Sequence, residues 1–199
     1  MADKIVIEVY KTKNTDELTK LLADPDSRLE TGSGAAMTAS VAAALLCRAA
    51  KQSQAAVGGE RLEYIVRNAE IIRGYMAHLI DEDVKCRGPL RRAMQEGGEQ
   101  EIEAARHPAV SICEEIINMM AQTLDMLLEI SSLCPEAARH YVHSAADLAM
   151  GAIRAAMRYV LDMAGKCTEE TYCFVTRREN EMTLERCTSI HEQITAAHS

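Results

Sequence analysis

An uncharged run of 17 residues, Thr31 to Cys47, constrains the fold of this chain more than any other feature. The run is dominated by alanine, glycine and serine, and alanine is the residue that most favours an α-helix. A helix that lacks a charged face is stable in a globular protein when other helices surround it. The run is shorter than the roughly 20 apolar residues that cross a bilayer, and it is rich in alanine rather than leucine. It therefore predicts a central, buried helix and no membrane span.

The rest of the chain is also predicted to be helical. Four prolines and ten glycines interrupt it, and between them apolar residues recur every three or four positions. We expect helices at about 14–24, 34–56 and 60–88, a fourth from about Pro108, a fifth from Pro135 to Gly165, and a last one from Thr168 to near the C-terminus. Residues 4–10, "KIVIEVY", have no strand to pair with and are expected to form an extended arm or an intersubunit contact. The predicted fold class is all-α: a bundle of long helices in a single domain over residues 1–199, preceded by that short extended arm.

The composition argues against several classes of function. The formal net charge is −8, there is no tryptophan and only one phenylalanine, whereas nucleic-acid binding needs basic surface and usually stacking aromatic rings. The first residues show no signal-peptide pattern. The seven cysteines form no Cys-x-x-Cys pair and are odd in number, which indicates reduced thiols rather than a disulfide framework or a zinc site. We therefore expect a cytoplasmic protein with no bound metal.

The turn Gly32-Ser33-Gly34 leads directly into the uncharged helix. The first N–H groups of a helix have no partner within the helix, so they can bind a carboxylate, a phosphate or a polar heterocycle. The alternative is a tight turn and helix cap without any ligand. The turn does not match a phosphate-binding loop, which would require a lysine after the last glycine.

Asp83, in the segment "LIDEDVKC", lies in register with an apolar stripe, four residues after Leu79. A carboxyl group that is buried on such a stripe suits general acid or base catalysis. The alternative is an exposed acid near a helix end at 88–89, with Asp81 and Glu82 as solvated neighbours. Acidic clusters are more often of this second kind.

A polar, net basic stripe is expected on the fifth helix, opposite its alanine-rich face. At 3.6 residues per turn its members lie within roughly 60° of one another. They are His140, His143, Asp147, Arg154 and Arg158. The stripe could hold an anionic substrate, with His143 and Asp147 as an i,i+4 pair that fixes the imidazole tautomer. The alternative is the solvated side of an amphipathic helix.

Four segments, in this order, make the chain resemble the cyclodeaminase/cyclohydrolase family, whose helical domain forms or opens the methenyl bridge of tetrahydrofolate. "TGSGAAMTASVAAALLCRAA" stands where the family has a Pro-Gly-Gly-Gly-Ser type turn and a small-residue helix. "LIDEDVKC" matches a Leu-x-x-x-Asp motif, with Asp83 as its acid. "EAARHP" (103–108) matches an "EAAxxP" motif, and residues 145–148 match an "AADL"-like segment. The resemblance covers nearly the whole chain.

Several polar positions of the family pattern differ in this chain. Thr31 replaces the proline of the turn and Ser33 interrupts its glycines. His140-Tyr141 stand about where the family has a Ser-Asp pair. "SQAAVGGE" replaces a lysine-rich run after the second helix, and "RYVLDMAG" replaces an asparagine-rich end of the fifth.

The resemblance implies a helical bundle that forms a homodimer and acts on a tetrahydrofolate derivative without a bound cofactor. In cyclodeamination N10 of 5-formimino-tetrahydrofolate attacks the formimino carbon and ammonia leaves, whereas in cyclohydrolysis water attacks the methenyl carbon. Both reactions pass through a tetrahedral carbon between two nitrogens and need a group that transfers protons. We assign that role to Asp83 as a hypothesis.

The remaining predicted site residues would bind the substrate. The amides of Gly32 to Ala35 would receive the pterin or its polar edge. Arg154 and Arg158 would attract the glutamate tail, and His143 with Asp147 would complete the binding stripe. The alternative hypothesis is a diverged member that binds a folate-like ligand or a protein partner without this catalysis.

Overall fold

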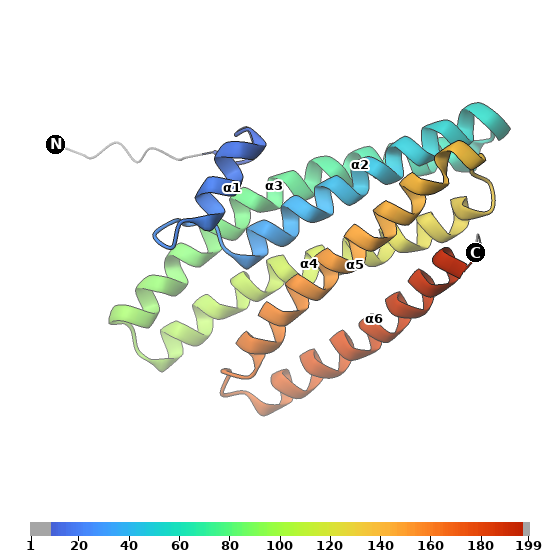
Figure 1. The fold of residues 1–199 in the computed structure, drawn as a ribbon. Helices are drawn as coiled ribbons and strands as arrows, with labels where there is room; N and C mark the ends of the chain where they lie inside the picture. The colour runs from blue at the N-terminus through green and yellow to red at the C-terminus, as the bar shows by residue number, and fades with distance from the viewer. Residues whose placement is uncertain (1–8, 197–199) are drawn as a thin grey trace.

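The computed structural model describes residues 9–196, which fold into six α-helices and one short 3-10 helix (Figure 1). Their bounds are α1 Thr15–Ala23, α2 Thr31–Val57, α3 Glu60–Glu96, α4 Glu99–Ser131, η1 Glu136–Ala138, α5 Arg139–Ala164 and α6 Glu170–Ala196. No strand occurs between residues 9 and 196, so the predicted all-α class is confirmed. The expected arm "KIVIEVY" falls largely on residues 4–8, outside the described part of the chain.

Helix α2 occupies the centre of the bundle, as the uncharged run predicts. It contacts α3, α4 and α5, and its inner face is rich in alanines with no exposed surface, among them Ala39, Ala42 and Ala43. Small side chains let the neighbouring helices approach closely, and the larger Leu, Ile and Met side chains of those helices fill the space. The same helix is the one element of residues 9–196 whose length and hydropathy would suffice to cross a membrane, but 56% of its most apolar window is buried inside the protein.

The remaining helices surround this centre (Figure 1). Helices α2 to α5 run side by side as long antiparallel rods, and α6 lies along α4 and α5. The short α1 is joined to the start of α2 by a loop, and Leu22 of α1 packs beside Gly34. The N-terminus of α2 therefore lies in a corner formed by α1, its loop and α3.

Two predicted helix boundaries are wrong because the helices pass through their prolines. Helix α3 continues beyond Pro89 to Glu96, and α4 begins at Glu99 and includes Pro108. A proline inside a helix removes one backbone hydrogen bond and strains the preceding turn. Both proline rings are exposed, whereas Leu90 and Ala109 beside them are buried. Burial of these neighbours outweighs the local cost, and the break between the two helices falls at residues 97–98.

Two further boundaries differ by a few residues at helix starts. Helix α2 begins at Thr31 rather than at residue 34, so Gly32, Ser33 and Gly34 belong to its first turn. The helix expected from Pro135 begins with a 3-10 turn, and α5 proper starts at Arg139. The earlier start of α2 has a specific cause in the contacts of Asp83.

Candidate functional site

Asp83 is fully buried at the N-terminus of α2. It is carried by the apolar stripe of α3, and its exposed fraction is 0%. Its Oδ2 accepts hydrogen bonds from the backbone N–H of Ser33 at 2.8 Å and from Ser33 Oγ at 2.7 Å. Its Oδ1 accepts one from Nε of Arg87 at 2.8 Å. The carboxylate thus caps a helix that carries partial positive charge at this end, which explains why α2 begins as early as Thr31.

A line of alternating charges connects Asp83 to the surface. Arg87, only 4% exposed, binds Asp83 through Nε and Glu30 through Nη1. Glu30 in turn accepts from Nη2 of Arg91 at 2.6 Å. The side chains of Glu30 and Arg91 are 37% and 45% exposed, so this outer pair reaches solvent. A buried carboxylate is tolerated when it is paired and hydrogen-bonded in this way.

Two buried groups near Asp83 can each form a hydrogen bond that they do not form in this structure. Nη2 of Arg87 and the hydroxyl of Tyr159 have no hydrogen-bond partner among residues 9–196. The ring of Tyr159, on α5, stacks on the Arg87 guanidinium with 4.1 Å between the ring centre and Cζ. Burial raises the pKa of Tyr159 to about 12, although Arg87 acts in the opposite direction. The phenol therefore keeps its proton at neutral pH and is a hydrogen-bond donor.

Gly32 is required by the close approach of α2 to this cluster. A Cβ at Gly32 would lie 2.3 Å from Oδ1 of Asp83 and 3.0 Å from Nη2 of Arg87. Both distances are too short for a side chain, so the cluster occupies the space next to the Gly32 backbone. Cys113 of α4 is also fully buried. Burial, and secondly the negative charge of Asp83, raises the pKa of its thiol to about 12. The Cys113 thiol therefore keeps its proton at neutral pH and is not a nucleophile.

Two of the amides that were predicted to be free, those of Ser33 and Gly34, are hydrogen-bonded within the chain. The N–H of Ser33 is bound to Asp83, and that of Gly34 donates to the carbonyl of Glu30 at 3.0 Å within the helix. The helix N-terminus does receive an anion, as its polarity favours, but that anion is the chain's own Asp83. The structure therefore shows a cap at this turn, and the binding of a ligand by its backbone stays a prediction.

The predicted stripe on α5 is not joined to Asp83. Oδ1 of Asp147 lies 2.6 Å from Nε2 of His191 on α6, a contact that the sequence did not predict. The reason is that α6 packs against this side of α5 and presents His191 there. Arg154 and Arg158 are exposed. Arg158 directly precedes Tyr159, which places its guanidinium at the same end of α5 as the cluster.

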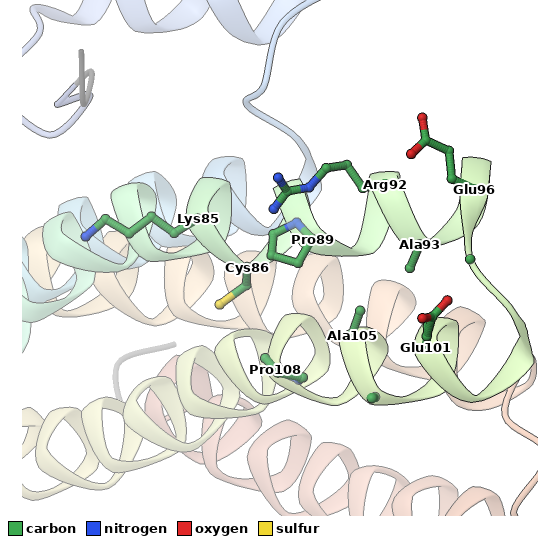
Figure 2. Close-up of a pocket in the computed structure, with 11 residues that line it drawn as sticks. Lys85, Cys86, Pro89, Arg92, Ala93, Glu96, Glu101, Ala105 and Pro108 are labelled. Carbon is green, nitrogen blue, oxygen red and sulfur yellow. The ribbon is translucent and has the colours of Figure 1, made fainter. Parts of the chain in front are cut away.

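A groove opens between α3 and α4 within one helical turn of Asp83 (Figure 2). Its volume is about 790 Å³, in the range of small-molecule sites. Small residues line it, namely Cys86, Pro89, Ala93, Ala104, Ala105 and Pro108, and they leave the space between the two helices unfilled. Lys85, Arg92, Glu96 and Glu101 also line it, and Figure 2 shows Glu96 extending away from the space between the two helices and Arg92 lying beside Pro89.

Sequence reasoning missed Arg87, Glu30 and Tyr159. Arg87 follows Asp83 by four residues, a spacing typical of a helical ion pair, so this signal was present. Glu30 and Tyr159 are far from Asp83 in sequence and no local pattern marks them. Within residues 9–196 no three His, Cys, Asp or Glu side chains are grouped as metal ligands.

Comparison with known proteins places this chain in a family. A sequence model of the formiminotransferase-cyclodeaminase family matches residues 14–182, a span that contains Asp83 and its whole charge network. The chain belongs to the formiminotransferase-cyclodeaminase family. This result confirms the resemblance that the four sequence segments indicate.

A solved structure agrees with the family match at the level of the fold. The chain is similar to formiminotetrahydrofolate cyclodeaminase from Thermotoga maritima, with a TM-score of 0.88 and 18% identity over 94% of this chain and 96% of that chain. Comparison with curated protein sequences gives no match. As a member of the formiminotransferase-cyclodeaminase family, the chain is a cyclodeaminase-like, folate-related protein.

Proposed function

We propose that this family member acts on the one-carbon bridge of a reduced folate, forming or hydrolysing the methenyl bridge of 5,10-methenyltetrahydrofolate. The observation that carries the proposal is the buried Asp83 carboxylate with two unused donor groups, on Arg87 and Tyr159, beside it. Bridge chemistry needs a proton acceptor that is held in place and donors that stabilise a polar tetrahedral intermediate. The cluster supplies both kinds of group in a low-dielectric setting.

In this proposal Asp83 accepts the proton of the attacking water or N10 and returns it to the departing nitrogen. Tyr159 and Arg87 donate hydrogen bonds to the polar edge of the folate, which faces Gly32 to Ala35. The substrate reaches Asp83 by displacing the Glu30–Arg91 pair, which is the exposed end of the charge network. The groove between α3 and α4 has the volume to take the body of a folate, and Arg154 and Arg158 attract its glutamate tail from the end of α5.

We also propose a cellular location, from the state of the cysteines, and an oligomeric state, from the outer side of α2. All seven cysteines are free thiols, which suits a cytoplasmic enzyme. The outward side of α2 carries no charged residue from Gly34 to Leu45, and Val41 on it is 52% exposed. An uncharged helix face of this kind fits a second copy of the chain, so we propose a homodimer.

Replacing Asp83 by Asn tests the catalytic role. Methenyl-tetrahydrofolate absorbs in the near ultraviolet, so its loss can be followed directly. We expect Asp83→Asn to lower the turnover number at least about 100-fold, the usual contribution of a general acid or base, with helicity retained by circular dichroism. Asp81→Asn is the matched control, because Asp81 is also buried on α3 but binds the backbone N–H of Tyr10 at 2.6 Å. Unchanged turnover in Asp83→Asn would remove Asp83 from the mechanism.

One observation favours a second candidate function, ligand binding without turnover. Both oxygens of Asp83 already accept hydrogen bonds from the chain itself. If these contacts persist in the complex, the chain binds a folate and does not convert it. Calorimetry with a non-reactive folate, compared with the absorbance assay, separates the two: binding without turnover above buffer selects the second candidate.

A further inference from the structure

Two cysteines lie together at the junction of α5 and α6, outside the Asp83 network. Cys167 belongs to the loop after α5, and Cys173 belongs to the first turn of α6. Sγ of Cys173 lies 3.5 Å from the carbonyl oxygen of Cys167. It also lies 2.8 Å from the carbonyl oxygen of Ala164, which accepts a hydrogen bond from the N–H of Cys167 at 3.1 Å. The sulfur of Cys173 is therefore in contact with the main chain of Cys167.

The thiol of Cys167 is directed to the same end of α5. Its Sγ lies 3.4 Å from the carbonyl oxygen of Met163, the residue before Ala164. The two sulfur atoms thus lie beside consecutive carbonyl groups at a helix end, where such groups lack partners within the helix. Joining the sulfurs requires rotation of the two side chains and, at most, a shift of the loop at 165–169, which belongs to no helix.

Exposure distinguishes these two thiols from most of the others. Four of the seven cysteines are buried, and buried thiols do not react with a dissolved oxidant while the chain is folded: Cys47, Cys113, Cys134 and Cys187. The other three, Cys86, Cys167 and Cys173, are partly exposed. Because Cys86 is carried by α3 beside the groove, the junction of α5 and α6 is where two accessible thiols occur together.

Arg106, in the segment 103–108, holds the loop that carries Cys167. Its Nη1 donates hydrogen bonds to the carbonyl of Lys166 at 2.6 Å and to Oε2 of Glu103 at 2.7 Å. Burial raises the pKa of the Cys167 thiol, whereas a hydrogen bond with Arg106 acts in the opposite direction. Since the thiolate is the form that reacts, oxidation is expected to be slow at neutral pH and faster as the pH rises.

We propose that Cys167 and Cys173 form a site of reversible oxidation, which reacts with a small disulfide of the oxidised glutathione type and becomes an intramolecular disulfide. One thiolate of the pair attacks a sulfur of oxidised glutathione, forms a mixed disulfide and releases one glutathione. The other thiolate then attacks the protein sulfur of the mixed disulfide and releases the second glutathione. In total two protein thiols lose two electrons and two protons, and one oxidised glutathione gains them as two glutathione thiols.

The disulfide would tie the start of α6 to the end of α5. None of residues 170–175 of α6 is buried, and Phe174 among them is 71% exposed. Segments with so few buried contacts open locally. The crosslink restricts this opening, and reduction restores it. In a reducing compartment such a bond is transient, as in redox-sensing proteins, and this site is separate from the proposed folate chemistry.

Oxidation of the full chain with glutathione disulfide at pH 8 tests the proposal. Free thiols are then blocked with iodoacetamide in denaturant, and mass spectrometry counts the blocked thiols and identifies crosslinked peptides. We expect two of the seven thiols to escape blocking in at least about half of the chains, through a bond between Cys167 and Cys173 that a dithiol reverses. Hydrogen exchange of residues 170–175 should slow at least about tenfold in the oxidised chain.

Serine variants identify the two sulfurs. Cys167→Ser and Cys173→Ser each keep a hydrogen-bond donor for the end of α5, and each should stop at the mixed disulfide with glutathione. Cys86→Ser is the matched control, because it removes the third partly exposed thiol and should leave the crosslink intact. The proposal is overturned if all seven thiols of the unchanged chain are blocked, or if the crosslink joins another pair. Unchanged exchange at 170–175 in the crosslinked chain would overturn the proposed effect on α6.

Discussion

At the scale of single residues, Gly32 shows how closely the Asp83 cluster fits its surroundings. A methyl group there would overlap Oδ1 of Asp83, and this carboxylate is fixed by Ser33 at Oδ2 and by Arg87 at Oδ1. We expect Gly32→Ala to lower the free energy of unfolding by about 1–3 kcal/mol, the usual cost of overpacking. Urea unfolding measures this. Gly34→Ala is the control, because its Cβ would meet only the flexible end of Leu22 at 3.3 Å and alanine favours helix, so its stability should be unchanged or higher.

The sequence predicted the position of Asp83 but not its partners. Its register with Leu79 indicated burial, and burial is what the structure shows, against the alternative of a solvated acid. Its contact with Ser33, and the contact of Arg87 with Tyr159, join segments that are 50 and more residues apart, and local periodicity does not encode such pairs. The contact of Asp147 with His191 was missed for the same reason, since His191 lies 44 residues further on in another helix.

At the scale of elements, the prolines inside α3 and α4 are the clearest departure from the sequence-based expectation. Proline interrupts isolated helices at a cost of about 3 kcal/mol, which made 88–89 and Pro108 natural boundaries. In the folded chain the buried neighbours of each proline continue the helix across it. Helix type and approximate position followed from periodicity. The exact ends did not, because they depend on packing between α3 and α4.

Replacing Pro89 by Ala tests this account of the helix. Because Pro89 is exposed within α3, alanine restores a backbone hydrogen bond without loss of packing. We expect Pro89→Ala to raise the free energy of unfolding by about 1–3 kcal/mol in a urea titration. Pro135→Ala should do the opposite and lower it by about 0.4–1 kcal/mol, since Pro135 precedes a helix with φ −64° and restricts the unfolded chain. A loss of stability in Pro89→Ala would show that the shape of the groove depends on the proline.

At the scale of the whole molecule, the uncharged run from Thr31 to Cys47 predicted the architecture better than any single motif. It required a central helix and enough surrounding helices to cover it, and α2 lies among α3, α4 and α5. That pattern does not indicate how copies of the chain assemble. The outer side of α2 is uncharged from Gly34 to Leu45, and the homodimer on it remains a proposal.

Val41→Glu tests the proposed dimer. A charge in the middle of an apolar contact would be buried without a partner, so we expect the dissociation constant of the dimer to rise at least tenfold. Sedimentation velocity at micromolar concentration would then show a monomer. Ile71→Glu is the matched control, because Ile71 is 67% exposed on α3 and lies outside the α2 face. A monomeric unchanged chain, or dissociation by Ile71→Glu alone, would contradict the proposed interface.

The alanine lining of α2 also limits how this chain can diverge in evolution. At Ala42 or Ala43 a larger side chain has room only when a facing residue of a neighbouring helix becomes smaller at the same time. Accepted changes at the centre of the bundle must therefore come in compensating pairs, whereas the surface can change one position at a time. A lineage under this constraint can keep the course of its helices while most of its sequence is replaced. That history is compatible with a fold that is retained at 18% identity to the cyclodeaminase of Thermotoga maritima.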